Sequence, residues 1–205
     1  MKIFGIGLNY FQHNKEADEA LYRLEAPVVF TKPDSAILKN GKPFFVPDWS
    51  SDMAAETEIV VRICKLGKSI PERFAYRYYD ALTVGIDFTA RDWLGRLRRE
   101  GLPWDMSKGF DGSAVLGEWV AKEELPDVGH LGFRLDINGE TRQTGNTADL
   151  VFGVDRLIAY ISQFFTLKMG DLIYTGTPAG VPKVEIDDHL TGFVEGRKVL
   201  EFNCK

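Results

Sequence analysis

The chain is poor in cysteine, has no long apolar run and carries no dominant charge. Cys64 and Cys204 are its two cysteines, too few for a disulfide scaffold or a cysteine-rich zinc site, so we expect a reducing, cytoplasmic compartment. No stretch approaches the roughly 20 apolar residues of a membrane span, and the N-terminus lacks the apolar core of a signal peptide. With 25 Lys and Arg against 30 Asp and Glu, nucleic acid is not an expected partner.

The sequence also lacks the signatures of several enzyme classes. It has no Gly-x-Ser-x-Gly nucleophile elbow, no His-Glu-x-x-His zinc motif and no phosphate-binding loop. The glycines at 5 and 7 are not followed by the third glycine of a dinucleotide fingerprint. These absences leave serine hydrolases, zinc proteases and nucleotide-binding enzymes without support.

The patterns that are present predict an α+β fold in one domain over residues 1–205. Hydrophobic residues make up 44% and charged residues 27%, the balance of a globular chain. Periodicity predicts more strands than helices, in a mixed or antiparallel sheet. The expected strands are 2–8, 27–31, 58–64, 81–86, 131–138, 172–175 and a closing pair around Gly192 and Gly196. The expected helices are 13–23, 71–79, 89–100 and 155–165, and Asn138-Gly139 is a hairpin signal.

Three carboxylates beside apolar segments are candidate metal ligands. Glu56 and Glu58 are two residues apart at the head of such a segment, and on a strand residues with this spacing point to one face. Asp87 follows the apolar residues 82–86. Two Glu and one Asp give an all-oxygen donor set that suits Mg²⁺ or Mn²⁺. The alternatives are surface exposure of both glutamates, which avoids burying like charges, and helix N-capping by Asp87.

His13 and Glu16 are candidates for a general base, because residues three apart share one face of a helix. A carboxylate beside an imidazole orients it and raises its basicity, which suits activation of water. The alternative, a surface histidine beside a surface glutamate, is favoured by the spacing alone. Lys108, followed by Gly109, is a candidate electrostatic or proton-donating group in a cavity, with an ordinary loop lysine as the alternative.

The turn at residues 175–178, Thr-Gly-Thr-Pro, follows an apolar strand. Its hydroxyls and amides could hold an anionic substrate group, and a plain turn is the alternative. Arg96, Arg98 and Arg99 cluster near Asp92 and Glu100, which is typical of a solvated helix face rather than of a nucleic-acid site.

Six short segments occur in the order and at spacings similar to those of one known family. They are Gly-Leu-Asn-Tyr at 7–10 leading to His13, Phe-Thr-Lys-Pro at 30–33, Glu-Thr-Glu at 56–58, Asp-Phe-Thr-Ala-Arg-Asp at 87–92, Ser-Lys-Gly-Phe-Asp-Gly at 107–112 and Thr-Gly-Thr-Pro-Ala-Gly-Val at 175–181. Together they span nearly the whole chain, and the pieces at 89–92 and 175–178 are the most specific. The sequence resembles the fumarylacetoacetate hydrolase family in its short, single-domain, acylpyruvase-like form.

This resemblance implies a rolled, mixed β-sheet of the family's C-terminal-domain type with a few flanking helices. It implies that Glu56, Glu58 and Asp87 hold Mg²⁺ or Mn²⁺. It also implies that His13 and Glu16 are the pair that activates water, carried on a helix that closes over the site.

Four further positions acquire roles from the resemblance. Lys108 matches a lysine that binds or protonates an enolate near the metal, and Lys32, Arg91 and Thr177 match positions that line the substrate pocket. The implied substrate is a small 2-oxo acid, and the implied assembly is a homodimer.

Two positions depart from the pattern of acylpyruvase-like members. A Gln often lies seven residues after the metal-binding Asp, and here that position is Leu94. Ala55 stands before Glu56, where a His or Tyr is common. An apolar Leu cannot hydrogen-bond a substrate oxygen, so the departure at 94 bears on the choice of substrate.

The resemblance implies a metal-dependent hydrolase that cleaves a carbon–carbon bond in an acylpyruvate-like 2,4-dioxo acid by way of an enolate bound to the metal. The presence of both His13 and Glu16 favours hydrolysis, which needs an activated water. The second alternative is an isomerase, tautomerase or decarboxylase acting on a 2-oxo (2-hydroxy-diene) dicarboxylate such as 2-hydroxyhepta-2,4-diene-1,7-dioate or oxaloacetate. The third, a binding protein without activity, is opposed by retention of the three carboxylates, the His–Glu pair and Lys108.

Overall fold

The structure, a computed structural model, describes residues 1–10, 24–38 and 41–205, and most of its strands form one mixed sheet. The strand order is β2-β1-β10-β4-β5-β6-β3, with β7 paired to β5. β1 pairs with β10, and β3 with β6, in parallel, while the other pairs are antiparallel. The strand bounds are β1 Ile3–Gly7, β2 Val28–Lys32, β3 Ile37–Leu38, β4 Met53–Ile63, β5 Tyr79–Ala90, β6 Ala114–Leu116, β7 Val120–Ala121 and β10 Leu172–Tyr174.

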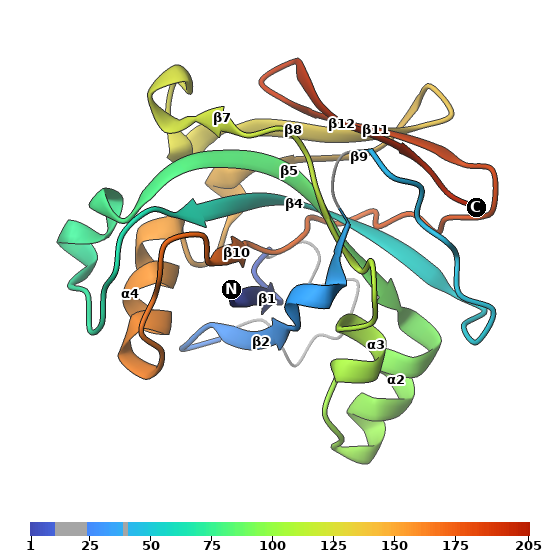
Figure 1. The fold of residues 1–205 in the computed structure, drawn as a ribbon, viewed down its shortest axis with the longest axis horizontal. Helices are drawn as coiled ribbons and strands as arrows, with labels where there is room; N and C mark the ends of the chain where they lie inside the picture. The colour runs from blue at the N-terminus through green and yellow to red at the C-terminus, as the bar shows by residue number, and fades with distance from the viewer. Residues whose placement is uncertain (11–23, 39–40) are drawn as a thin grey trace.

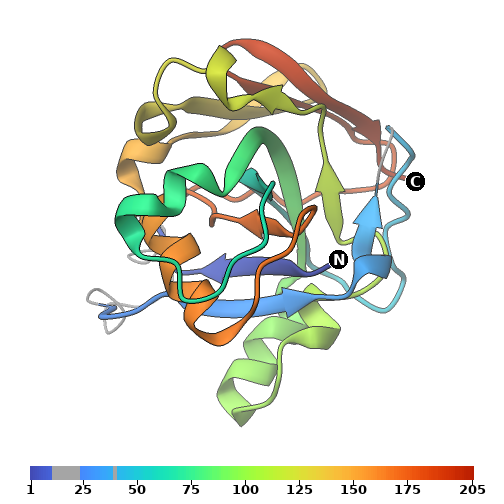
Figure 2. The same cartoon turned by 60° about the vertical axis from the view of Figure 1, so that its left-hand side comes forward.

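A second sheet, antiparallel and four-stranded, lies over the long β4–β5 pair, on the side away from β1 and β2 (Figure 1). Its order is β12-β11-β8-β9. Its bounds are β8 Gly132–Ile137, β9 Glu140–Asn146, β11 His189–Val194 and β12 Arg197–Asn203. Figure 2 shows the main sheet curling into an open roll below this second sheet, which confirms the expected α+β fold with a rolled, mixed sheet.

Helices flank the sheets at two ends of the molecule, with α4 at one end and α2 and α3 at the other (Figure 1). The α-helices are α2 Arg91–Glu100, α3 Asp105–Lys108 and α4 Val154–Phe164. The short 3-10 helices are η2 Asp34–Ala36, η3 Glu72–Arg77, η4 Lys122–Glu124, η5 Val128–His130 and η6 Thr147–Asp149. The helix expected at 13–23 lies outside the described residues.

The apolar run in β4 is explained by burial of both of its faces. Ile59 and Val61 belong to the large core between the two sheets. Val60, whose side chain points the other way, belongs to a smaller core inside the roll with Leu172 and Tyr174. A strand that is covered on both sides is continuously apolar rather than alternating, so the polar residues that β4 does carry are placed deep in the protein.

Element boundaries near the candidate carboxylates differ from the sequence prediction. β4 begins at Met53, and β5 continues to Ala90, so Glu56, Glu58 and Asp87 lie inside long strands rather than at their ends. The N-cap of α2 is Ala90, which removes helix capping as a role for Asp87. The extra strand length comes from pairing between β4 and β5, a tertiary effect that local propensity does not report.

Local turn chemistry was predicted well. Asn138 and Gly139 both have positive φ, 55° and 82°, and join β8 to β9, as a two-residue hairpin turn requires. Gly101 ends α2 with φ of 66°, where glycine avoids the strain of the left-handed conformation. The segment expected as a helix at 71–79 forms only the 3-10 helix η3, preceded by Pro71.

None of the helices in the described part of the chain is long and apolar enough to cross a membrane. Cys64 and Cys204 are both free thiols.

Gly85 lies beside the carboxylates at a position that leaves no room for a side chain. It is paired with Glu58 across β4 and β5. A Cβ atom there would lie 2.6 Å from Val60 Cγ2, 2.7 Å from Val115 O and 2.9 Å from Tyr174 Cε1. Overpacking of this kind costs about 1–3 kcal/mol, so we expect Gly85→Ala to lower the free energy of unfolding by that amount in urea titrations.

Gly95→Ala is the matched control for this prediction. Gly95 lies within α2, and its nearest contact to a new Cβ would be Arg99 Nη1 at 3.5 Å. Replacing a helical glycine with alanine stabilises by roughly 0.5–1 kcal/mol, so the two substitutions should act in opposite directions. Parent-like stability of Gly85→Ala would contradict the packing assigned to this strand.

Candidate functional site

Strand pairing brings the three candidate carboxylates together. Glu56 and Glu58 are two residues apart on β4 and therefore share a face, and Glu56 is the register partner of Asp87 on β5. One carboxylate oxygen from each of the three residues lies within 4.8 Å of the others. Gly85, the register partner of Glu58, adds no side chain to this face.

Glu58 is the more deeply buried of the two glutamates, and the turn after β10 donates a hydrogen bond to its carboxylate. It is 1% exposed, and its Oε2 accepts a hydrogen bond from the Gly176 amide at 2.6 Å. Burial, followed by the charges of Asp87 and Glu56, raises the pKa of Glu58 well above its ordinary value. A carboxyl group in this state is ionised fully only when positive charge is brought close to it.

Lys108 supplies positive charge at the centre of the cluster. Its Nζ lies 2.7 Å from Glu56 Oε2 and 2.7 Å from Asp87 Oδ2. Burial lowers the pKa of this ammonium group, but Asp87 and Glu56 outweigh that effect and raise the pKa above its usual value. The residue ends the one-turn helix α3 and is buried, so it is not an exposed loop lysine, and its role toward a substrate stays a prediction.

Lys32, expected to line a substrate pocket, is buried behind Asp87. Its ammonium lies 2.6 Å from Asp87 Oδ1, donates to Ser113 Oγ at 3.0 Å and contacts the carbonyl of Lys108. Burial lowers the pKa of Lys32, and the charge of Asp87 opposes that shift. These contacts make Lys32 a counter-charge that also ties the end of α3 to β5.

Thr177 and Arg91, the other two expected substrate contacts, are engaged with the protein. Thr177 Oγ1 donates to the carbonyl of Thr57 at 3.0 Å and is 3% exposed. Arg91 is the first residue of α2, and its guanidinium pairs with Asp52 at 2.9 Å. The pair is half exposed, so it contributes little stability. Arg91 is the more available of the two side chains.

Gln143 is a buried residue of the site that the sequence did not reveal. From β9 its Oε1 accepts a hydrogen bond from the Thr57 amide at 3.1 Å, and its Nε2 donates to Thr177 Oγ1 at 2.9 Å. The neighbouring residues on β9 are exposed, so no apolar pattern marked this position. Leu94, which stands where a glutamine is common, is itself buried on α2.

His13 and Glu16, the proposed base pair, lie outside the described residues. Their placement relative to the carboxylates therefore stays a prediction. The chain approaches the site just before them, because Asn9 donates to the Thr175 carbonyl at 2.8 Å.

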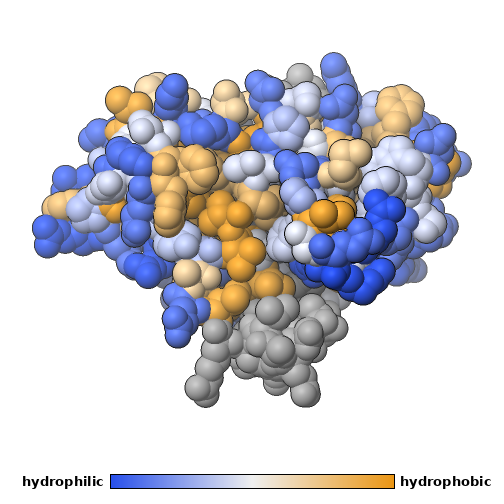
Figure 3. Space-filling view, turned by 90° about the horizontal axis from the view of Figure 1, so that it is seen from below, coloured by the Kyte–Doolittle hydropathy of each residue, from blue (hydrophilic) through white to orange (hydrophobic). Residues whose placement is uncertain are grey.

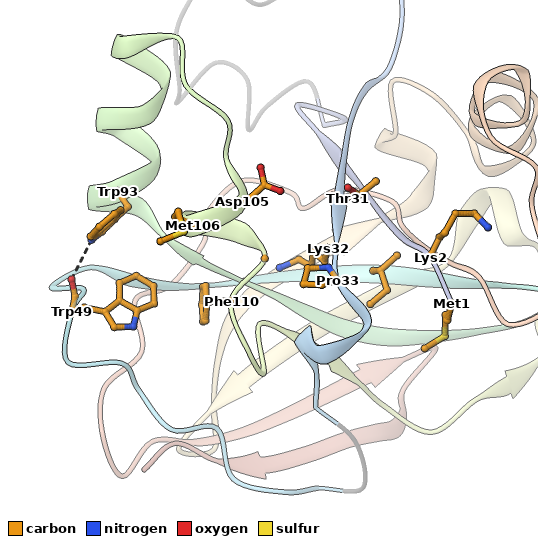
Figure 4. A pocket seen from close by; sticks show the side chains of 12 residues that line it. Met1, Lys2, Thr31, Lys32, Pro33, Trp49, Trp93, Asp105, Met106 and Phe110 are labelled. Atoms are coloured by element: carbon orange, nitrogen blue, oxygen red, sulfur yellow. Dashed lines mark hydrogen bonds between the residues drawn. The ribbon is translucent and has the colours of Figure 1, made fainter.

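Two cavities each have in their lining a lysine that pairs with Asp87, and neither is lined by one of the three carboxylates. One, of about 350 Å³, is lined by Lys108 together with Phe30, Leu102 and Trp104. The larger, of about 800 Å³, is mostly apolar and has Lys32 in its lining. Figure 4 shows the larger cavity with Trp49, Trp93, Met106 and Phe110 on one side and Met1, Lys2 and Thr31 on the other. Each cavity therefore reaches one of the two lysines that pair with Asp87.

The chain matches a known protein family over nearly its whole length. The family model described as fumarylacetoacetate hydrolase C-terminal matches residues 2–204. The chain belongs to the fumarylacetoacetate hydrolase family. It is 36% identical over 200 residues to the mitochondrial oxaloacetate tautomerase of Mus musculus, covering 98% of this chain and 90% of the mouse protein.

Solved structures give the same assignment. The chain is similar to fumarylpyruvate hydrolase from Pseudomonas aeruginosa, solved in complex with Mn²⁺ and pyruvate, with a TM-score of 0.93, 31% identity and coverage of 100% of this chain and 89% of that one. It is also similar to 2-hydroxyhepta-2,4-diene-1,7-dioate isomerase from Mycobacterium marinum, with a TM-score of 0.85, 30% identity and coverage of 99% and 73%. The fumarylacetoacetate hydrolase family member described here is thus an enzyme whose relatives include hydrolases, isomerases and tautomerases.

The carboxylate cluster of this family member fits a hard divalent cation. All three candidate donors are carboxylate oxygens, which Mg²⁺ and Mn²⁺ prefer. Burial, and after it the charges of Asp87 and Glu56, raises the pKa of Glu58, so the negative charge on Glu58 is poorly compensated at that position. A cation among the three oxygens would relieve that repulsion.

Glu58→Gln tests whether the charge of Glu58 both destabilises the metal-free protein and binds the metal. The amide can still accept from the Gly176 amide, while the buried charge is lost. We expect the metal-free variant to be more stable than the parent in urea unfolding, because the cost of burying the Glu58 charge is removed and repulsion by Asp87 and Glu56 falls. We also expect Mn²⁺ affinity, measured by calorimetry, to fall by more than the roughly 10–100-fold that loss of an outer partner costs.

Glu140→Gln, an exposed change on β9, is the control and should leave both quantities unchanged. Parent-like Mn²⁺ affinity in Glu58→Gln would remove Glu58 from the candidate metal centre.

Proposed function

We propose that this enzyme uses a divalent metal, Mg²⁺ or Mn²⁺, to hydrolyse a carbon–carbon bond in an acylpyruvate-like 2,4-dioxo acid. The observation that carries the proposal is the buried cluster of Glu56, Glu58 and Asp87 with the Lys108 ammonium between two of its members. The three carboxylates would hold the metal. When bound there, it supplies Lewis acidity that polarises a 2-oxo acid and favours the enolate.

Lys108 is the group best placed to respond to negative charge on the substrate. Its ammonium is buried, raised in pKa by its carboxylate neighbours and adjacent to the small cavity. A fixed cation in a site that excludes water stabilises charge that develops during the reaction. Lys32 contacts the other carboxylate oxygen of Asp87, so Asp87 would keep a counter-charge if Lys108 contacted a substrate oxygen.

Hydrolysis requires an attacking water in addition to this cluster. We assign its activation to His13 and Glu16. Water adds to the carbonyl remote from the carboxylate, giving up one proton to His13. The carbon–carbon bond then breaks, its electron pair stays on the pyruvate-forming fragment as an enolate, and protonation of that carbon gives pyruvate and a carboxylic acid.

Tautomerisation of a 2-oxo dicarboxylate is the second candidate. It is favoured by the relatives named oxaloacetate tautomerase and by Leu94, which lacks the amide expected of acylpyruvase-like members. This reaction moves one proton between carbon and oxygen and needs no attacking water. Decarboxylation of the same enolate-forming substrates remains a third outcome for one scaffold.

A small substrate panel decides between these reactions. We expect acetylpyruvate and fumarylpyruvate to yield pyruvate with Mg²⁺ and to yield none when a chelator is added. Oxaloacetate, followed by its enol absorbance and by pyruvate release, reports tautomerisation and decarboxylation separately. Pyruvate formation that persists with the chelator would contradict the metal requirement.

His13→Ala separates the reactions within the panel. General acid–base catalysis contributes about 10²–10⁴-fold, so hydrolysis should fall by that factor while Mn²⁺ affinity is kept. Oxaloacetate tautomerisation should persist, because it uses no attacking water. Parent-like hydrolysis in the variant would remove His13 from the mechanism.

Lys108→Met tests the cation with oxalate, a mimic of the enolate. The substitution keeps the length of the side chain and removes the charge that contacts Glu56 and Asp87. We expect oxalate to bind at least tenfold more weakly in the presence of Mn²⁺, because an ion-assisted hydrogen bond is lost. Equal oxalate affinity in calorimetry would contradict the role assigned to Lys108.

The homodimer and the cytoplasmic location are proposals from the resemblance and from composition. The larger apolar cavity, and the apolar side chains that gather on the face shown in Figure 3, offer surface that a second copy could cover. Exposed Met106 and half-exposed Trp49 lie at that cavity. A molar mass of one chain from light scattering would contradict the dimer.

A further inference from the structure

The two glutamates are carried by a stretch of β4 that lies beyond its pairing with β10. That pairing joins Leu172, Ile173 and Tyr174 to residues 60–62 of β4. Farther along, the chain leaves the ladder as the turn at 175–178. At Thr57, between Glu56 and Glu58, two side chains occupy the place of a neighbouring strand.

Those two side chains satisfy both backbone groups of Thr57. Gln143 Oε1 accepts from its amide at 3.1 Å, and Thr177 Oγ1 donates to its carbonyl at 3.0 Å. Gln143 Nε2 in turn donates to Thr177 Oγ1 at 2.9 Å and to the Pro178 carbonyl at 2.8 Å. The carboxamide of Gln143 thus clamps strand and turn together.

This clamp crosses from one sheet to the other. Gln143 is 3% exposed and belongs to β9, in the four-stranded sheet, while Thr57 belongs to the main sheet. Gly145 lets β9 come close to the turn, because a Cβ there would lie 2.8 Å from Pro178 Cγ. The same turn carries Gly176, whose amide binds Glu58 Oε2.

We propose that Gln143 is a positioning residue that, through Thr57 and the turn at 175–178, aims the Glu56 and Glu58 carboxylates at one point. The inference rests on the metal site of the proposed function and names a residue that is not one of the three proposed ligands. Outer groups that orient ligands are worth roughly 10–100-fold in metal affinity.

Gln143→Met removes the three hydrogen bonds at nearly constant volume. We expect Mn²⁺ affinity of the folded variant, measured by calorimetry, to weaken roughly 10–100-fold. In the metal-free protein, we expect the Thr57 amide to exchange with solvent deuterium faster than in the parent, because its acceptor is gone. Should the variant not fold, Gln143→Asn, which keeps the amide but is too short to span the gap, carries the same expectations.

Ser162→Ala is the matched control for loss of buried hydrogen bonds. Its hydroxyl accepts from Ile70 and donates to the carbonyl of Ala159 on α4, away from the clamp. We expect it to lower thermal stability while leaving Mn²⁺ affinity and Thr57 exchange at parent values. A loss of affinity in Ser162→Ala as large as in Gln143→Met would show a general stability effect and overturn the proposal.

Two further results bear on the proposal separately from the proposed function. Failure of the parent protein to bind Mn²⁺ would overturn the proposed function, while exchange at Thr57, which needs no metal or substrate, still tests the clamp. Parent-like Thr57 exchange in Gln143→Met would overturn the clamp in either case. Parent-like Mn²⁺ affinity in that variant, with a parent that binds Mn²⁺, would overturn its positioning role.

Discussion

Full burial of Glu58 and Asp87, with partly buried Glu56 beside them, is the constraint on which the site and its surroundings depend. Isolated buried charges are prohibitively costly, so Glu56, Glu58 and Asp87 require cations nearby. Lys108 and Lys32 meet Asp87 from two sides, and the bond from Lys32 to Ser113 fixes the segment that follows Lys108. The neutralising groups therefore also shape the cavity beside them.

The shared face of Glu56 and Glu58 was predictable from periodicity, but their proximity to Asp87 was not. Spacing by two placed Glu56 and Glu58 on one face, and the structure agrees. Their meeting with Asp87 depends on the register between β4 and β5, which no local pattern encodes. The resemblance in segment order supplied that step, because it carries information about tertiary contacts that single residues lack.

The contacts that sequence reasoning missed are those of polar residues whose partners lie far along the chain. Lys32 ends an apolar strand, and lysine is almost never fully buried unless paired. Its partners Asp87 and Ser113 could not be inferred from its neighbours. Gln143 sits in a strand of exposed residues, where a buried amide leaves no trace in hydropathy. His13 and Glu16 are outside the described residues.

The two lysines have a consequence for the order in which ligands arrive. With all groups ionised, three carboxylates and two ammonium groups leave the cluster with one net negative charge. A divalent ion bound among the three ionised carboxylates would change this to one net positive charge, which attracts an anionic 2-oxo acid. In the proposed function, the divalent cation therefore binds first, and the anionic acid binds after it.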